Sequence, residues 1–175
     1  MRGRAVSVVE VVIALVVLGI VAAVTLPRFS RAATAGPDEE TLLRDRLRVL
    51  RVAIERYYQD HRSWPGQHGD GQNAGGTAAA FVAQLMQRTD ESGRIVTEEP
   101  QHGRLFGPYL TEGVPASPVG LLRGERGVHV IRGSALPLPL TAGESAAAWV
   151  YNCDTGQIGC NSTGRDAAGR SHAGY

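Results

Sequence analysis

An uncharged run with a single acid at its start limits what the first part of this chain can fold into. Residues 11–26 carry no charged side chain, and Glu10 lies directly before them. As a helix this run is about 24 Å long, which is shorter than the roughly 30 Å hydrocarbon core of a membrane. A helix that begins at Val6 reaches about 31 Å. A spanning helix therefore places Glu10 inside the apolar layer.

An acidic side chain in the apolar layer needs a partner. Its insertion costs on the order of 2 to 3 kcal/mol even on lenient scales, so Glu10 predicts a functional role. The flanking charges do not decide the orientation of the segment. Arg2 and Arg4 precede it, and Arg28 and Arg31 follow it, so the two sides balance.

Two ordinary interpretations of this segment compete with a functional one. A secretory signal peptide would use residues 33–35, Ala-Thr-Ala, as its cleavage site. Against it, Glu10 interrupts the apolar region, and Arg28 and Arg31 lie between that region and the cleavage site. The second alternative is a plain signal anchor that holds an unrelated periplasmic binding domain. Neither alternative explains why an acid stands at position 10.

The spacing of four residues resembles the leader and first helix of type IV pilin-like proteins, which include the pseudopilins of type II secretion. In that family a short basic leader ends in a small residue, a Glu is the fifth residue of the mature chain, and a Pro stands near its twenty-second. Cleavage between Ala5 and Val6 makes Glu10 the fifth residue here and Pro27 the twenty-second. Ala5 replaces the usual Gly, and Val6 replaces the common Phe.

The resemblance implies a processing and assembly mechanism. A prepilin peptidase would remove the leader, residues 1–5, and methylate the new amine of Val6. The carboxylate of Glu10 would then pair with the N-terminal amine of a neighbouring subunit, a pairing that matters most where both charges lack water. Pro27 would kink the transmembrane and polymerisation helix, which covers residues 6–36.

The region after Pro37 is expected to form a periplasmic domain, residues 37–161. Acidic residues open a helix predicted over 38–62, and apolar residues recur in it at spacings of three and four. Its charged face is typical of a solvated surface, with contacts along a filament as the alternative. The segment Trp-Val-Tyr-Asn-x-x-Thr-Gly-x-Ile at 149–158 resembles the closing hairpin of pseudopilins, and it predicts a late β-hairpin over 147–161. The expected fold is α+β, with the long N-terminal helix packed on a small antiparallel sheet.

Two cysteines lie near the end of the chain. Cys153 and Cys160 would face each other and form a disulfide if Gly156 and Gln157 make the tip of the hairpin. A shift of the register would separate them. The tail, residues 162–175, consists of Gly, Ala and polar residues, so we expect it to be disordered.

Motifs that carry catalysis or bind metals are absent from the sequence. It contains no G-x-S-x-G, H-E-x-x-H or Walker loop, and its five histidines show no ligand spacing. We therefore expect no enzyme activity, no metal site and no cofactor. Calcium is an alternative, with ligands from Asn152, Asp154, Asn161 or Asp166. Lys and Arg number 18 against 17 for Asp and Glu, and this balance argues against a nucleic-acid partner.

The resemblance implies a pseudopilin of a type II secretion system. Such a subunit would be a single-pass protein of the inner membrane with its C-terminal domain in the periplasm. It would polymerise with itself and with other pseudopilins on an inner-membrane assembly platform, and the filament would drive protein secretion. The alternative within the family is a minor pilin of a type IV pilus, used in adhesion, motility or DNA uptake.

Overall fold

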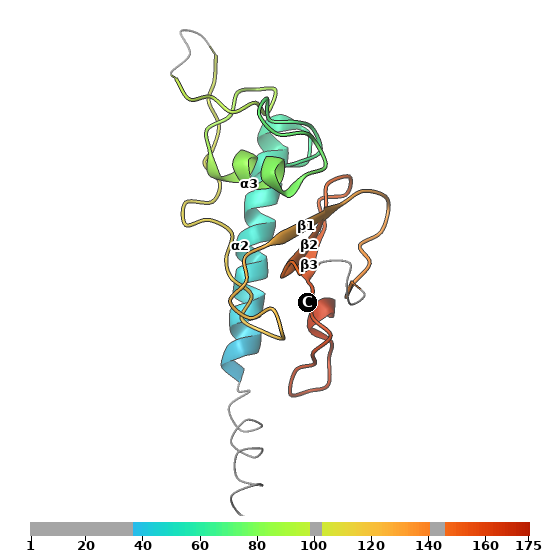
Figure 1. Cartoon of the computed structure of the whole chain (residues 1–175). Helices are drawn as coiled ribbons and strands as arrows, with labels where there is room; N and C mark the ends of the chain where they lie inside the picture. The colour runs from blue at the N-terminus through green and yellow to red at the C-terminus, as the bar shows by residue number, and fades with distance from the viewer. Residues whose placement is uncertain (1–36, 99–102, 141–145) are drawn as a thin grey trace, which may run out of the picture. The chain divides into compact units, whose positions relative to one another are not determined.

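One long helix runs beside a small three-stranded sheet in the computed structural model, which describes residues 37–98, 103–140 and 146–175 (Figure 1). Together these residues make an α+β unit. The elements are α2 (Pro37–His61), α3 (Ala78–Met86), β1 (Val128–Ile131), β2 (Trp149–Asn152), β3 (Ile158–Cys160) and the 3-10 helix η1 (His172–Gly174). The predicted leader and membrane helix, residues 1–36, lie outside the described residues.

Helix α2 supplies much of the core. The sequence places this helix over 38–62, and the structure has it over Pro37–His61. Its apolar positions at spacings of three and four face inward, and each is 2% exposed or less: Leu43, Leu47, Leu50, Ile54 and Tyr57. The helix ends where Arg62 takes a positive φ of 55° and its amide donates to the carbonyl of Tyr58.

The sheet is mixed, with strand order β1-β2-β3. Strands β2 and β3 are antiparallel, with Val150 opposite Gly159, but β1 runs parallel to β2, with Val128 opposite Trp149. The expectation of a purely antiparallel sheet is therefore wrong for β1. A parallel pair needs a crossover of about a dozen residues or more, and residues 132–148 provide one.

The first part of this crossover, residues 132–140, packs on the outer face of the sheet. Residues 136–140 alternate Leu and Pro, with the leucines half-buried and the prolines exposed. Leu138 packs closely against Gly159 of β3, because a Cβ added to this glycine would lie 2.2 Å from Cδ1 of Leu138. The side-chain amide of Asn152 donates to the carbonyls of Gly133 and Ala135 at 2.8 and 2.9 Å. Because Pro lacks an N–H, the Leu-Pro segment packs on the sheet without joining it as a strand.

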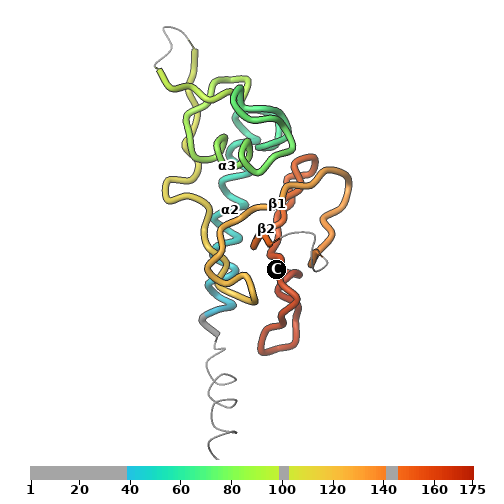
Figure 2. Tube along the Cα trace, in the orientation of Figure 1, coloured from blue at the N-terminus to red at the C-terminus, as the bar shows by residue number. Residues whose placement is uncertain are grey.

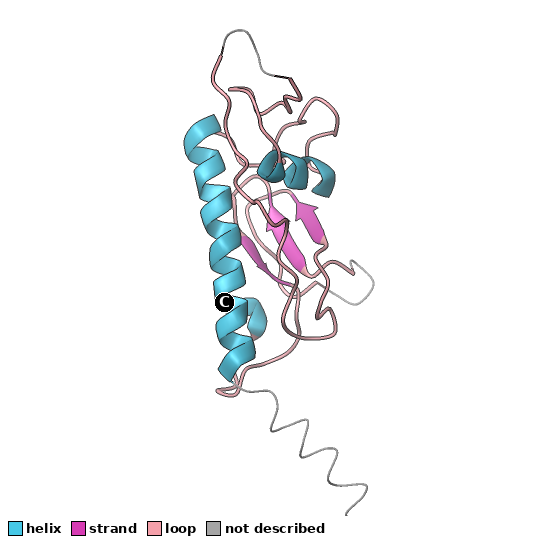
Figure 3. Cartoon of the chain, turned by 90° about the vertical axis from the view of Figure 1, so that its left-hand side faces the viewer, coloured by secondary structure: helices cyan, strands magenta, loops and turns pink. Residues whose placement is uncertain are grey.

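The inner face of the sheet packs on the two helices (Figure 3). Trp149 and Tyr151 of β2 are fully buried there. The ring of Tyr151 lies 4.3 Å from that of Phe81 on α3, between centroids. The indole N–H of Trp149 donates to the carbonyl of Pro115 at 2.8 Å, which satisfies its polar atom inside the core. Thr77 caps α3 by accepting from the amide of Ala80 at 3.2 Å.

The tail, residues 162–175, is ordered, so the expectation of disorder is wrong. Its trace turns back on itself (Figure 2) and ends in η1, where Arg51 of α2 donates to the carbonyl of Tyr175. An isolated bridge joins Arg165 to Ser171, and Asp166 opens the turn between them by accepting from the amide of Gly169 at 3.0 Å. Asp at the first position and Gly at the fourth are typical of a type I turn.

Candidate functional site

The residues that the sequence assigns to processing and assembly lie outside the described part of the chain. They are Ala5, Val6, Glu10 and Pro27. Over residues 37–98, 103–140 and 146–175, no helix is both long enough and apolar enough to cross a membrane. Roles for the four residues therefore stay predictions.

The two cysteines do not form the expected disulfide. Both are free and buried. In the hairpin Cys160 lies opposite Trp149, four residues before Cys153. Four residues along a strand separate Cα atoms by about 13 Å, whereas a disulfide needs less than about 7 Å. Burial raises the pKa of Cys160 to about 11 and also raises that of Cys153, so both thiols are protonated at neutral pH.

The disulfide was predicted wrongly because the turn of the hairpin lies earlier in the chain than expected. The side-chain oxygen of Asn152 accepts from the amides of Asp154 and Thr155 at 2.9 and 3.3 Å. This local pairing turns the chain at Asp154 and Thr155, two residues before the tip that a disulfide requires. Because the tip moves by two residues, each cross-strand partner moves by four.

The four residues considered as calcium ligands are each engaged elsewhere. Asn161 binds the amide of Leu140 and the carbonyl of Ala147. Asp154 accepts from Arg132 at 3.2 Å, and the Asn152 side chain is used in the turn and the crossover. Asp166 belongs to the network described below. Among the residues that the structure describes, no three His, Cys, Asp or Glu side chains are grouped so that they could hold a metal ion.

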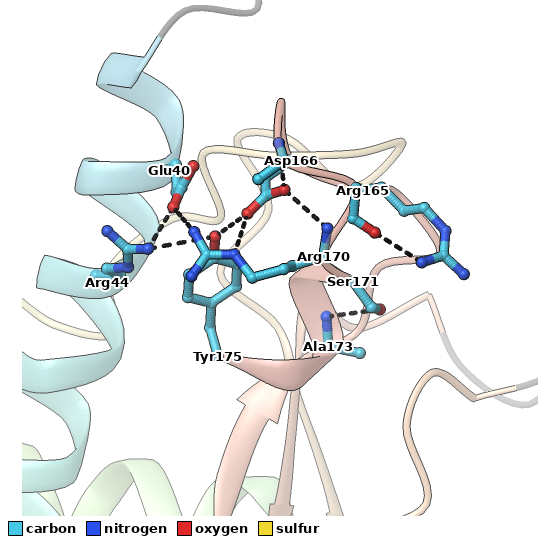
Figure 4. A network of polar contacts seen from close by, with 10 residues as sticks. Glu40, Arg44, Arg165, Asp166, Arg170, Ser171, Ala173 and Tyr175 are labelled. Atoms are coloured by element: carbon cyan, nitrogen blue, oxygen red, sulfur yellow. Dashed lines mark hydrogen bonds and ion pairs between the residues drawn. The ribbon is translucent and has the colours of Figure 1, made fainter.

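A network of charged groups fastens the tail to α2 (Figure 4). We call it the clasp: Glu40, Arg44, Asp166, Arg170 and Tyr175. The guanidinium of Arg170 bridges Asp166 at 2.8 Å and Glu40 at 2.5 Å. The hydroxyl of Tyr175 donates to Asp166, whose side chain is only 1% exposed. This hydrogen bond, with others from Arg170 and Ala168, lowers the pKa of Asp166 to about 2.

The clasp also holds the backbone of the last residue. Arg51 donates to the carbonyl of Tyr175 at 2.8 Å and to that of Ile158 at 3.3 Å. The guanidinium groups of Arg44 and Arg170 lie 4.8 and 5.3 Å from the centroid of the Tyr175 ring. Helix, tail and β3 are therefore joined at one place, next to the exposed side of α2.

Tyr175 lines two grooves of about 580 Å³ each. One lies between α2 and β3, where Trp64, Leu136 and Leu138 add apolar wall. The other runs along α2 itself, which we call the α2 groove. Its lining residues Arg44, Arg48, Arg51 and Arg56 outnumber the single acid Glu55, so it is a cationic surface.

The face of α2 that points away from the core is partly apolar. Leu42, Val49 and Val52 are 42%, 51% and 43% exposed. Four charged residues on the same side are also exposed, and their side chains form no hydrogen bond or ion pair with the described parts of the chain: Asp45, Arg48, Glu55 and Arg56. We call these seven residues, with Gln59, the outer face of α2. The side chains of this face are therefore available to contact another helix.

A polar cluster at the end of α2 ties the helix to two loops. The Nε2 atom of His61 lies 3.0 Å from the Thr89 hydroxyl and 3.2 Å from that of Tyr109, which donates to Asp60 at 2.9 Å. Burial is the main cause that lowers the pKa of His61, which therefore favours its neutral form. The contacts join three segments, and we assign the cluster a structural role.

The clasp was not predicted from the sequence. Two local signals mark it: the Asp-x-x-Gly turn at 166–169, and the spacing of four between Asp166 and Arg170, which form an ion pair. Glu40 and Arg44 lie too far away along the chain to be connected with them from the sequence. The outer face of α2 was visible as a charged stripe, but the absence of internal partners was not.

Comparisons with known proteins add no family to this geometry: no protein-family model, no curated protein and no solved structure matches the chain.

Proposed function

We propose that this protein is a pseudopilin subunit of a type II secretion system, which assembles into a periplasmic filament and performs no catalysis. The observation that carries the proposal is the spacing of Ala5, Val6, Glu10 and Pro27 around an uncharged segment. A single acid in a membrane helix is costly unless it meets a positive charge. The amine that cleavage after Ala5 would create is such a charge.

The described domain is consistent with this proposal. Residues 38–175 form a compact unit with its own core, so they can be carried by a separate anchor. Helix α2 uses one face for that core and leaves its outer face free of partners among the described residues. A subunit that packs against others along its length needs such a face.

In the proposed mechanism Glu10 sets the register of assembly. A prepilin peptidase would remove residues 1–5, and the amine of Val6 would carry a positive charge in the next subunit. Its attraction to the Glu10 carboxylate is strong because the apolar layer screens it weakly. A subunit that is out of register would leave both charges unpaired, which is unfavourable by several kcal/mol.

The first experiment is intact mass spectrometry and N-terminal sequencing of the protein from its native membrane, with and without the peptidase. A mature chain that begins at methylated Val6, only when the peptidase is present, supports the proposal. A chain that begins at Gly36 would show ordinary secretion and contradict it. An uncleaved chain would favour a plain signal anchor.

A second experiment asks whether Glu10 is needed for assembly. Glu10→Gln removes the charge and keeps the shape, so we expect normal membrane insertion but at least a tenfold loss of filaments in sheared fractions. Glu98→Gln is the control, because Glu98 is an exposed acid of the described domain. Filaments at the normal level in Glu10→Gln would refute the assembly role while leaving the cleavage result intact.

A further inference from the structure

The outer face of α2 has the spacing of a coiled-coil seam. Its central positions recur at alternating intervals of three and four residues, as do positions a and d of a heptad. These positions are Leu42, Asp45, Val49, Val52, Arg56 and Gln59. Arg48 and Glu55 flank them on one side, where a heptad places its charged g residues. A second helix therefore fits along this face.

The seam is complementary to itself when two copies run antiparallel. A two-fold axis midway between Val49 and Val52 places each of these residues opposite the other in the second copy. The same axis brings Asp45 opposite Arg56 of the second copy. On the flank it brings Arg48 beside Glu55 of the second copy. Because the axis repeats every contact, two copies form four ion pairs and two apolar pairs.

Parallel pairing does not reach this complementarity. In register, a parallel pair sets Asp45 against Asp45 and Arg56 against Arg56, and like charges that face each other are unfavourable. A parallel pair with a stagger satisfies one kind of ion pair at a time. Asp45 and Arg56 are eleven residues apart, whereas Arg48 and Glu55 are seven apart, so no single stagger satisfies both.

The α2 groove adds room for the flank of the second helix. Arg48, Val52 and Glu55 line it together with Tyr175, which the clasp holds in place. A helix laid on the seam would pass beside this groove, and its own Arg48 would come near Glu55 there. The clasp therefore shapes one wall of the surface without belonging to the seam.

We propose that the outer face of α2 binds the same face of a second copy of this chain, antiparallel about a two-fold axis. The inference rests on this helix face alone and not on the proposed function. Subunits of a filament that grows from one membrane run parallel, so the antiparallel pair is a separate association and not the contact between filament subunits. It buries the same face that a neighbouring subunit would use.

Charge reversal tests the pair in the full chain, in lipid nanodiscs or detergent, by sedimentation at several concentrations. Asp45→Arg sets like charges against each other twice, and we expect association to weaken about tenfold. Arg56→Asp should do the same, and the double variant should restore most of the affinity because the pairs are re-formed with reversed sign. Glu98→Arg, away from the face, is the control. A double variant no stronger than either single variant would overturn the proposal.

Cross-linking tests the direction of the helices. Variants with one added cysteine each are mixed in pairs: Asp45→Cys with Arg56→Cys, and Leu42→Cys with Gln59→Cys. The antiparallel pair predicts that both mixtures cross-link. The native thiols are buried, and the unaltered chain serves as the control for them. A link between positions 45 and 56 without one between 42 and 59 would indicate a parallel stagger of eleven, and no link in either mixture would exclude the pair; both results overturn the proposal.

Discussion

Both faces of α2 carry apolar residues, but the two faces meet different surroundings. On the inner face Leu50 is fully buried, while its neighbour Val49 on the outer face is 51% exposed. Charged side chains on the clasp side have partners within the chain, whereas Asp45 and Arg56 on the outer face have none among the described residues. The fold therefore needs only one side of the helix, and the other side is available for association.

Shortening one side chain on each face of α2 should give the largest difference in the free energy of unfolding. Leu50→Ala should lower the free energy of unfolding by about 2 to 5 kcal/mol, because it removes buried contacts and leaves a cavity. Val49→Ala should lower it by less than about 0.5 kcal/mol and weaken association instead. Urea unfolding followed by circular dichroism measures the first effect. Equal losses of stability would show that the outer face is also part of the core.

The clasp lies between the two faces of α2. A substitution in it is expected to have a smaller effect than Leu50→Ala, confined to the tail. Asp166→Asn removes the charge that Arg170 binds and weakens the acceptor for the Tyr175 hydroxyl. We expect faster amide hydrogen exchange over residues 164–175, with little change over β2. Asp154→Asn serves as the control, since Asp154 pairs with Arg132 outside the clasp. Unchanged exchange in the tail would mean that η1 is held by its other contacts.

The smallest expected effect concerns His61, which lies at the end of α2 and is partly buried. The pKa of His61 is lower in the folded protein than its ordinary value of about 6.5. As the pH falls through that value, the unfolded chain takes up the proton first, so stability falls toward acid pH. Unfolding at pH 5 and pH 7 measures this loss, and His61→Gln should reduce it. A stability that rises toward pH 5 in the unaltered chain would contradict the assignment.

Much of the helical part of the fold could be predicted from the sequence, because helix periodicity is local. The stripe from Leu43 to Tyr57 indicated α2, and the Trp-Val-Tyr-Asn segment indicated β2. The direction of β1 could not be predicted, because strand pairing depends on the path of the crossover at 132–148. The order of the tail depends on Glu40, which is 130 residues before Arg170 in the chain.

The candidate site, too, could be predicted from the sequence only in part. Residues 5–27 could be interpreted from spacing and charge alone, whereas the self-complementarity of the outer face became visible only when Asp45 and Arg56 proved to lack partners among the described residues. The predicted disulfide between Cys153 and Cys160 was wrong because of a single side chain. One side chain, Asn152, binds two amides and moves the turn by two residues.

The Leu-Pro crossover has a consequence for how this protein can associate. Pro137 and Pro139 are exposed and have no amide hydrogen to donate, so residues 136–140 are a poor template for pairing with a strand of another molecule. Backbone pairing along this segment, of the kind that builds fibrils, is therefore disfavoured. Contacts between helices depend on side chains, and they can form and separate many times.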